Sequence, residues 1–446
     1  MKFVVIGGDA AGMSAASKAK RNDPDTDVVV LEQTTDVSYS ACGLPYNLAE
    51  PERDMNDLVV RTAQVFRDKQ RIDLRIGNKA ERINRDRKTV SGRTSGGEPF
   101  EVDYDKLLIA TGARARMLNI PGEDLPGAKV LRSLEDGRII EAYMATNPVK
   151  RALIVGAGYI GLEMAEAFHE RGAQVEISDI LPGLLPWLPS EMSEVVRNEL
   201  EDKGARLHLG MGISRIEEFG GRLRVTLDDT VLDVDLVLMG VGVVPNSEIA
   251  SEAGLDLGPH NSIAVDKMLR TSDPDIFSAG DCADAFHVVT GQRVWIPLAL
   301  RANRGGWAVA DNVTGRHVEL PGIVGSAVFK VLDMEVAHTG LSPDEAAHAG
   351  FDVIDEVIKS RSRAHAHAGN QDIYVHLTAD KKSGKLLGGD LVGKEGAAHR
   401  VDALAVALHA GMSVQEFSQC DLAYAPPFSP VWDPLLTAAN QLLKKM

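Results

Sequence analysis

The chain has 446 residues, enough for two or three domains with a substantial buried core. Its 64 Asp and Glu outnumber its 48 Lys and Arg, and the formal net charge of −16 argues against nucleic acid or an anionic membrane as a partner. No apolar run approaches the roughly 18 residues that span a bilayer, and the first residues lack the pattern of a secretory signal, so we expect a cytoplasmic protein.

Two segments, one at the N-terminus and one a third of the way along the chain, follow the same plan. Each has a short apolar run, then a glycine-rich turn, Gly7 to Gly12 or Gly156 to Gly161, and then an Ala-rich stretch that predicts a helix, over residues 13–21 or 162–171. A strand, turn and helix in this order can bind a pyrophosphate at the helix N-terminus. One copy is weak evidence, but two complete copies indicate two dinucleotide-binding units.

A further predicted strand follows each helix and ends in an acid. Residues 27–32 end in Glu32 and residues 174–179 end in Asp179, each about 20 residues beyond the last glycine of its turn. A carboxylate at this spacing can accept hydrogen bonds from the hydroxyls of an adenosine ribose. Glu32 and Asp179 are therefore candidate ribose ligands.

Shorter apolar runs complete the predicted units. Residues 106–112 and 235–242 each close on glycine and predict the last strands of the two units, and residues 275–281 predict a strand that returns the chain to the first unit. Beyond about residue 320, strands alternate with amphipathic helices, which predicts a third, α+β domain. The expected elements of that tail are strands at 327–331 and 372–377 and a helix at 401–410.

Four motifs, at residues 7–12, 110–112, 156–161 and 278–281, together resemble the FAD-dependent pyridine nucleotide-disulfide oxidoreductases. The sequence Ser-Tyr-Ser-Ala-Cys-Gly-Leu-Pro-Tyr at residues 38–46 resembles the single-cysteine branch of that family, which holds coenzyme A disulfide reductases, persulfide reductases, NADH oxidases and NADH peroxidases. The resemblance implies an α/β fold with two Rossmann-like domains, for FAD and NAD, and a C-terminal α+β dimerisation domain. The expected boundaries are 1–115 and 245–318 for the FAD domain, 116–244 for the NAD(P)H domain and 319–446 for the dimerisation domain.

The resemblance implies FAD in the first turn and a nicotinamide cofactor in the second. We expect NADH in preference to NADPH, because Asp179 would repel a 2′-phosphate and Ile180 offers no positive charge. Tyr159 resembles a gate over the flavin face, Glu163 would lie near the nicotinamide, and Asp281 resembles the residue that holds the ribityl chain. The full set of expected cofactor-binding residues is Gly7, Ala10, Ala11, Gly12, Glu32, Gln33, Ala80, Ala110, Thr111, Gly112, Arg132, Gly156, Gly158, Tyr159, Ile160, Gly161, Glu163, Asp179, Gly242, Gly280, Asp281, Leu298 and Ala299.

Cys42 is the candidate catalytic nucleophile. It precedes a predicted helix, whose N–H groups and dipole can stabilise a thiolate, and no second cysteine lies near it in the sequence. The oxidised enzyme would then hold its oxidising equivalents as a mixed disulfide, a persulfide or a sulfenic acid. Cys282 and Cys420 match no motif, and we expect them to be inert.

The spacing of Ser14, Lys18 and Arg21, by four and three residues, puts them on one face of the first predicted helix. By the resemblance to coenzyme A reductases, which hold the CoA phosphates at such positions, the substrate-binding residues are Ser14, Lys18, Arg21, Ser38, Asn303 and Arg304. Ala10 stands near the point where NADH oxidases and peroxidases carry a histidine, which argues against those activities. Asp9 departs from the glycine of the consensus turn.

The segment Asp421 to Ser429 resembles one that crosses a dimer interface and puts a tyrosine hydroxyl beside the other subunit's cysteine. The resemblance therefore implies a homodimer in which Tyr424 is a catalytic residue, able to give a proton to a departing thiolate. His365 and His367 lie where many coenzyme A reductases carry a second tyrosine. No third ligand accompanies these two histidines, and we expect no metal.

These observations predict an enzyme that passes electrons from NADH through FAD to Cys42 and then to a low-molecular-weight disulfide or persulfide, with coenzyme A as the expected carrier of that sulfur. Two alternatives stay open. One is an NADH oxidase that reduces O2 through a Cys42 sulfenic acid, and the other is a non-catalytic flavoprotein that senses NADH. NADH consumption with and without an added disulfide distinguishes the three.

Overall fold

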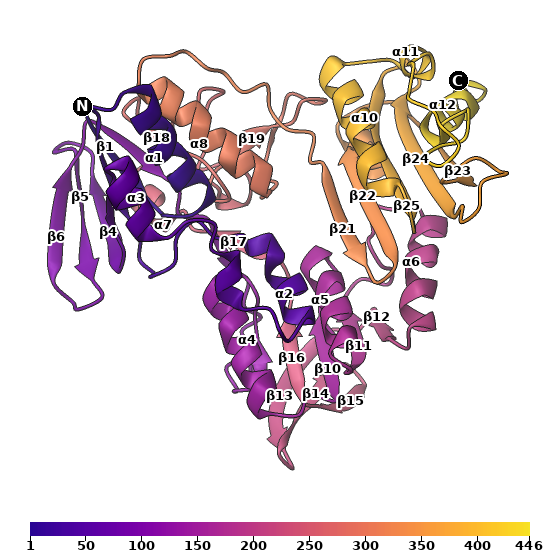
Figure 1. The fold of residues 1–446 in the computed structure, drawn as a ribbon, viewed down its shortest axis with the longest axis horizontal. Helices are drawn as coiled ribbons and strands as arrows, with labels where there is room; N and C mark the ends of the chain where they lie inside the picture. The colour runs from indigo at the N-terminus through magenta and orange to yellow at the C-terminus, as the bar shows by residue number, and fades with distance from the viewer.

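A computed structural model describes residues 1–446 (Figure 1). The first glycine turn directly follows β1, the central strand of the N-terminal sheet. The strand order of this sheet is β18-β7-β1-β2-β3, and every pair of neighbouring strands is parallel. Successive residues of the central strand point to opposite faces, and Val4 and Val5 belong to two different hydrophobic cores, so the sheet is covered on both faces. The strands are β1 (Lys2–Ile6), β2 (Asp27–Leu31), β3 (Asp73–Arg75), β7 (Lys106–Ile109) and β18 (Ile276–Ser278).

Two helices, α1 (Ala10–Asn22) and α8 (Ala299–Val313), pack side by side on one face of this sheet. They approach closely because Gly306 of α8 has no side chain, and a Cβ at that position would overlap the carbonyl oxygen of Ala11. Helix α1 begins three residues earlier than the sequence predicts. The last glycine of the turn thus lies inside its first turn, where a Cβ would overlap the carbonyl oxygen of Gly7.

The second sheet repeats this plan within an insertion. The chain leaves the first sheet after β7 and returns at β18, and the short strands β8 and β17 pair antiparallel where it leaves and comes back. The strand order of the second sheet is β12-β11-β10-β16-β9, and all neighbouring pairs are parallel. The residues at which the domains divide stay a prediction. The elements are β8 (Ala113–Ala115), β9 (Ala128–Lys129), α4 (Leu134–Thr146), β10 (Arg151–Val155), α5 (Tyr159–Glu170), β11 (Gln174–Asp179), α6 (Ser190–Asp202), β12 (Arg206–Leu209), β16 (Leu236–Met239) and β17 (Val243–Pro245).

The C-terminal domain is an antiparallel sheet of order β21-β22-β25-β24-β23, with helices α10 to α12 on one face (Figure 1). The hairpin β21–β22 and strand β25 dock on α5 and α6 through lysine–carboxylate pairs, Lys330 with Glu166 at 2.6 Å and Lys394 with Glu199 at 2.9 Å. The predicted fold class is confirmed. The elements are β21 (Ala327–Val331), β22 (Met334–Gly340), β23 (Val353–Arg361), β24 (Asp372–Asp380), β25 (Leu386–Gly393), α10 (Ala397–Ala410), α11 (Val414–Ser418) and α12 (Pro434–Leu443).

Smaller elements complete the chain. A three-stranded antiparallel sheet accompanies each nucleotide-type sheet, and short helices fill the connections. None of the helices combines the length and apolar character needed to cross a membrane. These elements are α2 (Leu44–Ala49), α3 (Ala63–Gln70), β4 (Asn78–Asn84), β5 (Thr89–Thr94), β6 (Pro99–Asp103), β13 (Ile213–Phe219), β14 (Arg222–Leu227), β15 (Thr230–Val234), α7 (Glu248–Glu252), β19 (Ala285–Phe286), β20 (Arg293–Val294) and α9 (Pro343–His348).

Candidate functional site

The two glycine turns have the same local geometry. Gly7 and Gly156 directly follow the central strands of their sheets and have φ of 109° and 104°, a region that favours glycine. A Cβ on either would collide with the carbonyl oxygen of the neighbouring strand's end, at Ala110 and at Gly240. Glycine is therefore required at both turns so that the chain can pass close to the next strand before entering the helix.

The two predicted ribose carboxylates are held by backbone N–H groups. Glu32 accepts from the N–H of Gly8 at 2.7 Å and from that of Thr34 at 2.7 Å. Asp179 accepts from the N–H of Ala157 at 2.8 Å and from that of Leu181 at 2.9 Å. Each carboxylate is thus fixed beside its turn and keeps free lone pairs that can accept from ribose hydroxyls.

Helices α1 and α5 begin without a side-chain cap, at Asp9 and Gly158. The Asp9 carboxylate turns away from the helix and accepts from the N–H of Tyr39 at 3.1 Å. Burial raises the pKa of Asp9 to about 6. The departure from glycine at this position therefore leaves the N–H groups of the first helical turn available to an anion.

Several of the other expected cofactor residues lie at the carboxyl ends of strands in the two parallel sheets. The segment 110–112 follows β7, the segment 280–281 follows β18, and Gly242 follows β16. Asp281 pairs with Arg132 at 2.6 Å. Leu298 and Ala299 stand at the start of α8, Ala80 lies in β4, and Gln33 is exposed after Glu32.

Cys42 lies in a 3-10 turn, Ala41–Gly43, directly before α2. Its side chain is accessible, yet desolvation by the surrounding protein and then the nearby Glu163 carboxylate raise the pKa of its thiol, while Arg132 opposes them. The predicted lowering of this pKa by a helix N-terminus is wrong for the chain's own groups, because desolvation outweighs the N–H groups of the six-residue α2 and the Glu163 carboxylate adds to it.

The other two cysteines occupy different surroundings. Cys282 is fully buried, with its sulfur 3.5 Å from the carbonyl oxygen of Ile109. Cys420 is partly exposed in the C-terminal domain, 3.8 Å from the carbonyl oxygen of Glu416. Neither belongs to a glycine turn, although Cys282 directly follows the expected cofactor residue Asp281.

Helices α2 and α5 are bonded to each other at two points. The Tyr46 hydroxyl donates to Glu163 at 2.7 Å, and Arg171, after the end of α5, donates to the carbonyl oxygen of Leu48 at 3.1 Å. Burial raises the pKa values of both Tyr46 and Glu163. The cysteine's helix and the helix of the second glycine turn are therefore held together, a contact that the sequence analysis missed although Tyr46 belongs to its cysteine motif.

Glu163→Gln is expected to lower the pKa of Cys42, because the substitution keeps a hydrogen-bond acceptor for Tyr46 and removes the negative charge that disfavours the thiolate. The reduced protein should therefore be alkylated by iodoacetamide severalfold faster at neutral pH, with its pH profile moved to lower pH. Glu170→Gln, an exposed change on the same helix, is the matched control and should leave the profile unchanged. An unaltered profile in Glu163→Gln would contradict this electrostatic role.

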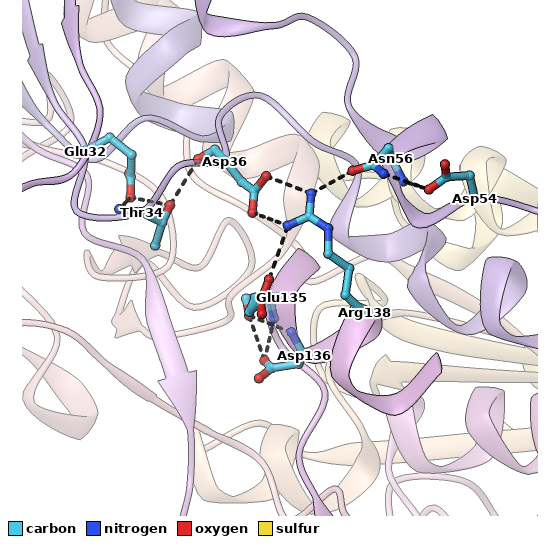
Figure 2. Close-up of polar contacts among 9 residues, drawn as sticks. Glu32, Thr34, Asp36, Asp54, Asn56, Glu135, Asp136 and Arg138 are labelled. Atoms are coloured by element: carbon cyan, nitrogen blue, oxygen red, sulfur yellow. Dashed lines mark hydrogen bonds and ion pairs between the residues drawn. The ribbon is translucent and has the colours of Figure 1, made fainter. Parts of the chain in front are cut away.

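A polar chain runs from Glu32 toward the cysteine's loop (Figure 2). The Thr34 hydroxyl lies 2.8 Å from Glu32 Oε1 and 3.1 Å from the carbonyl oxygen of Asp36. Arg138 of α4 donates to both carboxylate oxygens of Asp36, at 2.7 and 2.9 Å, and to the side-chain oxygen of Asn56 at 2.8 Å. One guanidinium thus clamps both ends of the loop 36–56 that contains Cys42, and no sequence motif pointed to it.

The predicted substrate residues lie mainly where α1 meets α8. The Ser14 hydroxyl donates to Asn303 at 2.7 Å, and Lys18 lies 3.6 Å from Asp311 with its ammonium 5.9 Å from the centre of the Trp307 ring. Arg21 and Arg304 are exposed without an ion pair, while Ser38 has φ of 51° in the cysteine's loop. The sequence analysis missed Trp307, whose ring is 53% exposed beside this cluster.

Tyr159 packs between two aromatic rings. Its ring centre is 4.8 Å from that of Phe329 and 6.3 Å from that of Trp187. Burial raises the pKa of Tyr159 to about 12. The ring therefore fills the space between the second glycine turn and the β21–β22 hairpin.

The C-terminal loop exposes large apolar side chains. Tyr424, Phe428, Val431 and Trp432 are each 47% to 77% exposed. No hydrogen bond joins Tyr424 to the loop of Cys42 within the chain. No group of three or more His, Cys, Asp and Glu side chains forms a metal site.

Known proteins resemble this chain in sequence and in structure. Two family models match, one described as pyridine nucleotide-disulphide oxidoreductase over residues 1–306 and the other as its dimerisation domain over residues 326–435. The chain is 37% identical over 446 residues to an NAD(P)H sulfur oxidoreductase (CoA-dependent) of Pyrococcus furiosus, covering 99% of both. It is 32% identical over 447 residues to an NADH oxidase of Methanocaldococcus jannaschii, covering 100% of this chain and 99% of that protein. The structure of an NAD-dependent persulfide reductase from A. fulgidus matches with a TM-score of 0.96 and 35% identity, over 100% of this chain and 83% of that one.

Proposed function

This chain belongs to the FAD-dependent pyridine nucleotide-disulphide oxidoreductase family, and we propose that it uses NADH to reduce a disulfide or persulfide carried by coenzyme A. The observation that carries the proposal is the isolation of Cys42. Its thiol is accessible in a loop that begins beside Glu32 and is bonded through α2 to the second glycine turn's helix. A lone accessible thiol between two dinucleotide turns fits one-sulfur redox chemistry.

The residues of the first turn fit FAD. Glu32 presents a fixed carboxylate for the ribose, the N-terminus of α1 is uncapped, and Gly7 keeps the backbone open to a pyrophosphate. When bound, FAD would supply a carrier that takes a hydride from the nicotinamide and delivers two electrons to a sulfur. Asp179 would orient the NADH ribose at the second turn.

Cys42 acts as the nucleophile toward the substrate. Its thiolate attacks one sulfur of the disulfide, a Cys42–sulfur bond forms, and the sulfur–sulfur bond of the substrate breaks to release a thiolate. Tyr424 of the partner subunit would protonate that leaving group. The dimerisation domain supports a homodimer, and the exposed apolar side chains of the Tyr424 loop are suited to be covered by a second subunit.

The test of the function is NADH oxidation with coenzyme A disulfide, coenzyme A persulfide, glutathione disulfide or no sulfur acceptor, in air and without oxygen. We expect turnover to require a sulfur acceptor and to be fastest with the coenzyme A compounds. The NADH oxidase among the relatives makes O2 reduction the second candidate. Rapid NADH loss that no sulfur compound alters, with stoichiometric O2 uptake, would transfer the assignment to that candidate.

Replacing Lys18 and Arg21 together with alanine is expected to raise KM for coenzyme A substrates by about 10-fold or more, because each charge-assisted phosphate contact contributes about 1.5–3 kcal/mol where water is partly excluded. A small polysulfide carries no phosphate and should be unaffected. Lys69→Ala, an exposed and unpaired lysine on α3, is the control. An equal loss for polysulfide and coenzyme A substrates would show that these cations do not recognise phosphate.

A further inference from the structure

A row of ionisable side chains crosses the C-terminal sheet on the face opposite helices α10 to α12. His338 of β22, Asp390 of β25 and His376 of β24 stand in direct register on three neighbouring strands. Their neighbours along the strands, Ala337 and Leu391 among them, pack on the helices, so the row points the other way. The row belongs to neither glycine turn and contains none of the residues that the sequence analysis singled out.

Hydrogen bonds fix the order of the row. Asp390 is buried and lies between the two imidazoles, 2.6 Å from His338 Nδ1 and 2.7 Å from His376 Nδ1. At the far end His376 Nε2 lies 3.4 Å from Asp355 of β23, whose side chain is 47% exposed. The Asp390 carboxylate therefore fixes the ring plane of His338, since its two oxygens are engaged by two different rings.

Charge stabilises this arrangement. Burial alone would lower the pKa of His376, but its contacts with Asp355 and Asp390 overcome burial and raise the pKa to about 9. Burial likewise opposes ionisation of Asp390, and the two histidine hydrogen bonds overcome it and lower its pKa. At neutral pH the Asp390 carboxylate thus lies beside the His376 imidazolium, and each oxygen of Asp390 is hydrogen-bonded to one histidine ring.

The near end of the row touches the aromatic group at the second glycine turn. The His338 ring lies 4.8 Å from the Trp187 ring at an interplanar angle of 53°. Trp187 in turn meets the Tyr159 ring edge-on, at 79°. Trp187 lies in the connection from β11 to α6, and Tyr159 is the first residue of α5. The His338–Trp187–Tyr159 contacts therefore join the C-terminal sheet to the segment that follows Asp179 and to the helix of the second glycine turn.

We propose that His338, oriented by Asp390, is a positioning residue that holds Trp187 against Tyr159 and so stabilises the packed position of the Tyr159 ring. The inference rests on the proposed function, because it takes residues 156–161 as the NADH site. A ring that leaves this position to admit a nucleotide gives up its contacts with Trp187 and Phe329. The apparent affinity for NADH is then reduced by the fraction of molecules in which the ring is packed.

Two substitutions separate the ring of His338 from its hydrogen bond. His338→Asn keeps a donor for Asp390 and removes the ring against Trp187, whereas His338→Phe keeps a ring and leaves Asp390 with one donor fewer. We expect His338→Asn to lower KM for NADH by about 3–10-fold with a smaller change in kcat. His338→Phe should stay near the wild-type KM and lower the thermal midpoint instead.

A double-mutant cycle with Trp187→Ala tests whether His338 acts through Trp187. The effect of His338→Asn on KM should vanish when Trp187 is already absent. A readout without turnover is acrylamide quenching of tryptophan emission, which should increase in His338→Asn and be unaffected by that substitution in a Trp187→Phe background. Lys69→Ala, an exposed substitution on α3 outside the row, should leave both KM and quenching unchanged.

An unchanged or raised KM in His338→Asn, or the same KM effect with and without Trp187, would overturn the inference. The same assay is run on Asp179→Ala to separate a failure of the positioning role of His338 from a failure of the NADH-site assignment. If Asp179→Ala changes KM for NADH and His338→Asn does not, only the positioning role of His338 fails. If neither substitution changes it, the assignment of the NADH site fails with it.

Discussion

Cys42→Ser is expected to abolish reduction of sulfur substrates, with kcat falling by at least about 10³-fold. The hydroxyl of serine is a far weaker nucleophile than a thiolate and cannot hold the substrate's sulfur in a disulfide. Cys282 cannot substitute because it is fully buried, and Cys420, which is partly exposed, is tested by the control below. The side chains are similar in size and the position is accessible, so the fold should persist.

The measurement pairs steady-state turnover with flavin content and with the loss of flavin absorbance on adding NADH under anaerobic conditions. In Cys42→Ser the flavin should be retained and still be reduced by NADH, which places the defect after the nicotinamide step. Cys420→Ser is the matched control and should keep full activity. Turnover of coenzyme A disulfide by Cys42→Ser at more than about a tenth of the wild-type rate would be incompatible with the assigned nucleophile.

The combined change of Asp179 to alanine and Ile180 to arginine is expected to shift the preference between NADPH and NADH by about 100-fold or more. The wild-type carboxylate, fixed by the N–H groups of Ala157 and Leu181, would accept from the ribose of NADH and repel a 2′-phosphate. Ile180 is 74% exposed beside it, so an arginine there can reach a phosphate without displacing core residues.

The quantity to compare is the ratio of kcat/KM for the two nucleotides in the wild type, in each single variant and in the double variant. Ile180→Arg alone is the internal control, because it adds the cation and leaves the repelling carboxylate in place. We expect its shift to be smaller than that of the double variant. Equal kcat/KM values for NADH and NADPH in the wild-type protein would remove the basis of the assignment.

The features that the sequence predicted correctly depend on residues that are close along the chain. The strand, turn and helix at Gly7 to Gly12 follow from a short buried strand and from a helix whose first turn overlaps the preceding backbone unless glycine is present. The placement of Glu32 follows equally directly, because two parallel strands joined by one helix bring the end of the second strand beside the turn. Motifs of this range identified the fold and the family.

The predictions that failed or were never made depend on contacts between distant residues. The expected lowering of the Cys42 pKa is reversed by desolvation and by Glu163, which reaches the cysteine's helix only through the packing of α2 on α5. Arg138 meets Asp36 across 102 residues, and Tyr46 meets Glu163 across 117. No local pattern encodes such pairs, because each needs two elements to be packed before its partners are neighbours.

The amino-acid sequence by itself thus determined the two strand–turn–helix units, the acids Glu32 and Asp179 beside their turns and the single cysteine of its motif, since strand periodicity, turn sterics and residue spacing act over one or two elements. Only the tertiary structure decided the direction of the Cys42 pKa, the orientation of Asp9 toward Tyr39 and the row from Asp355 to His338. The physical reason is that burial, electrostatic fields and cross-strand register are properties of packed elements, and they have no value until separate parts of the chain meet.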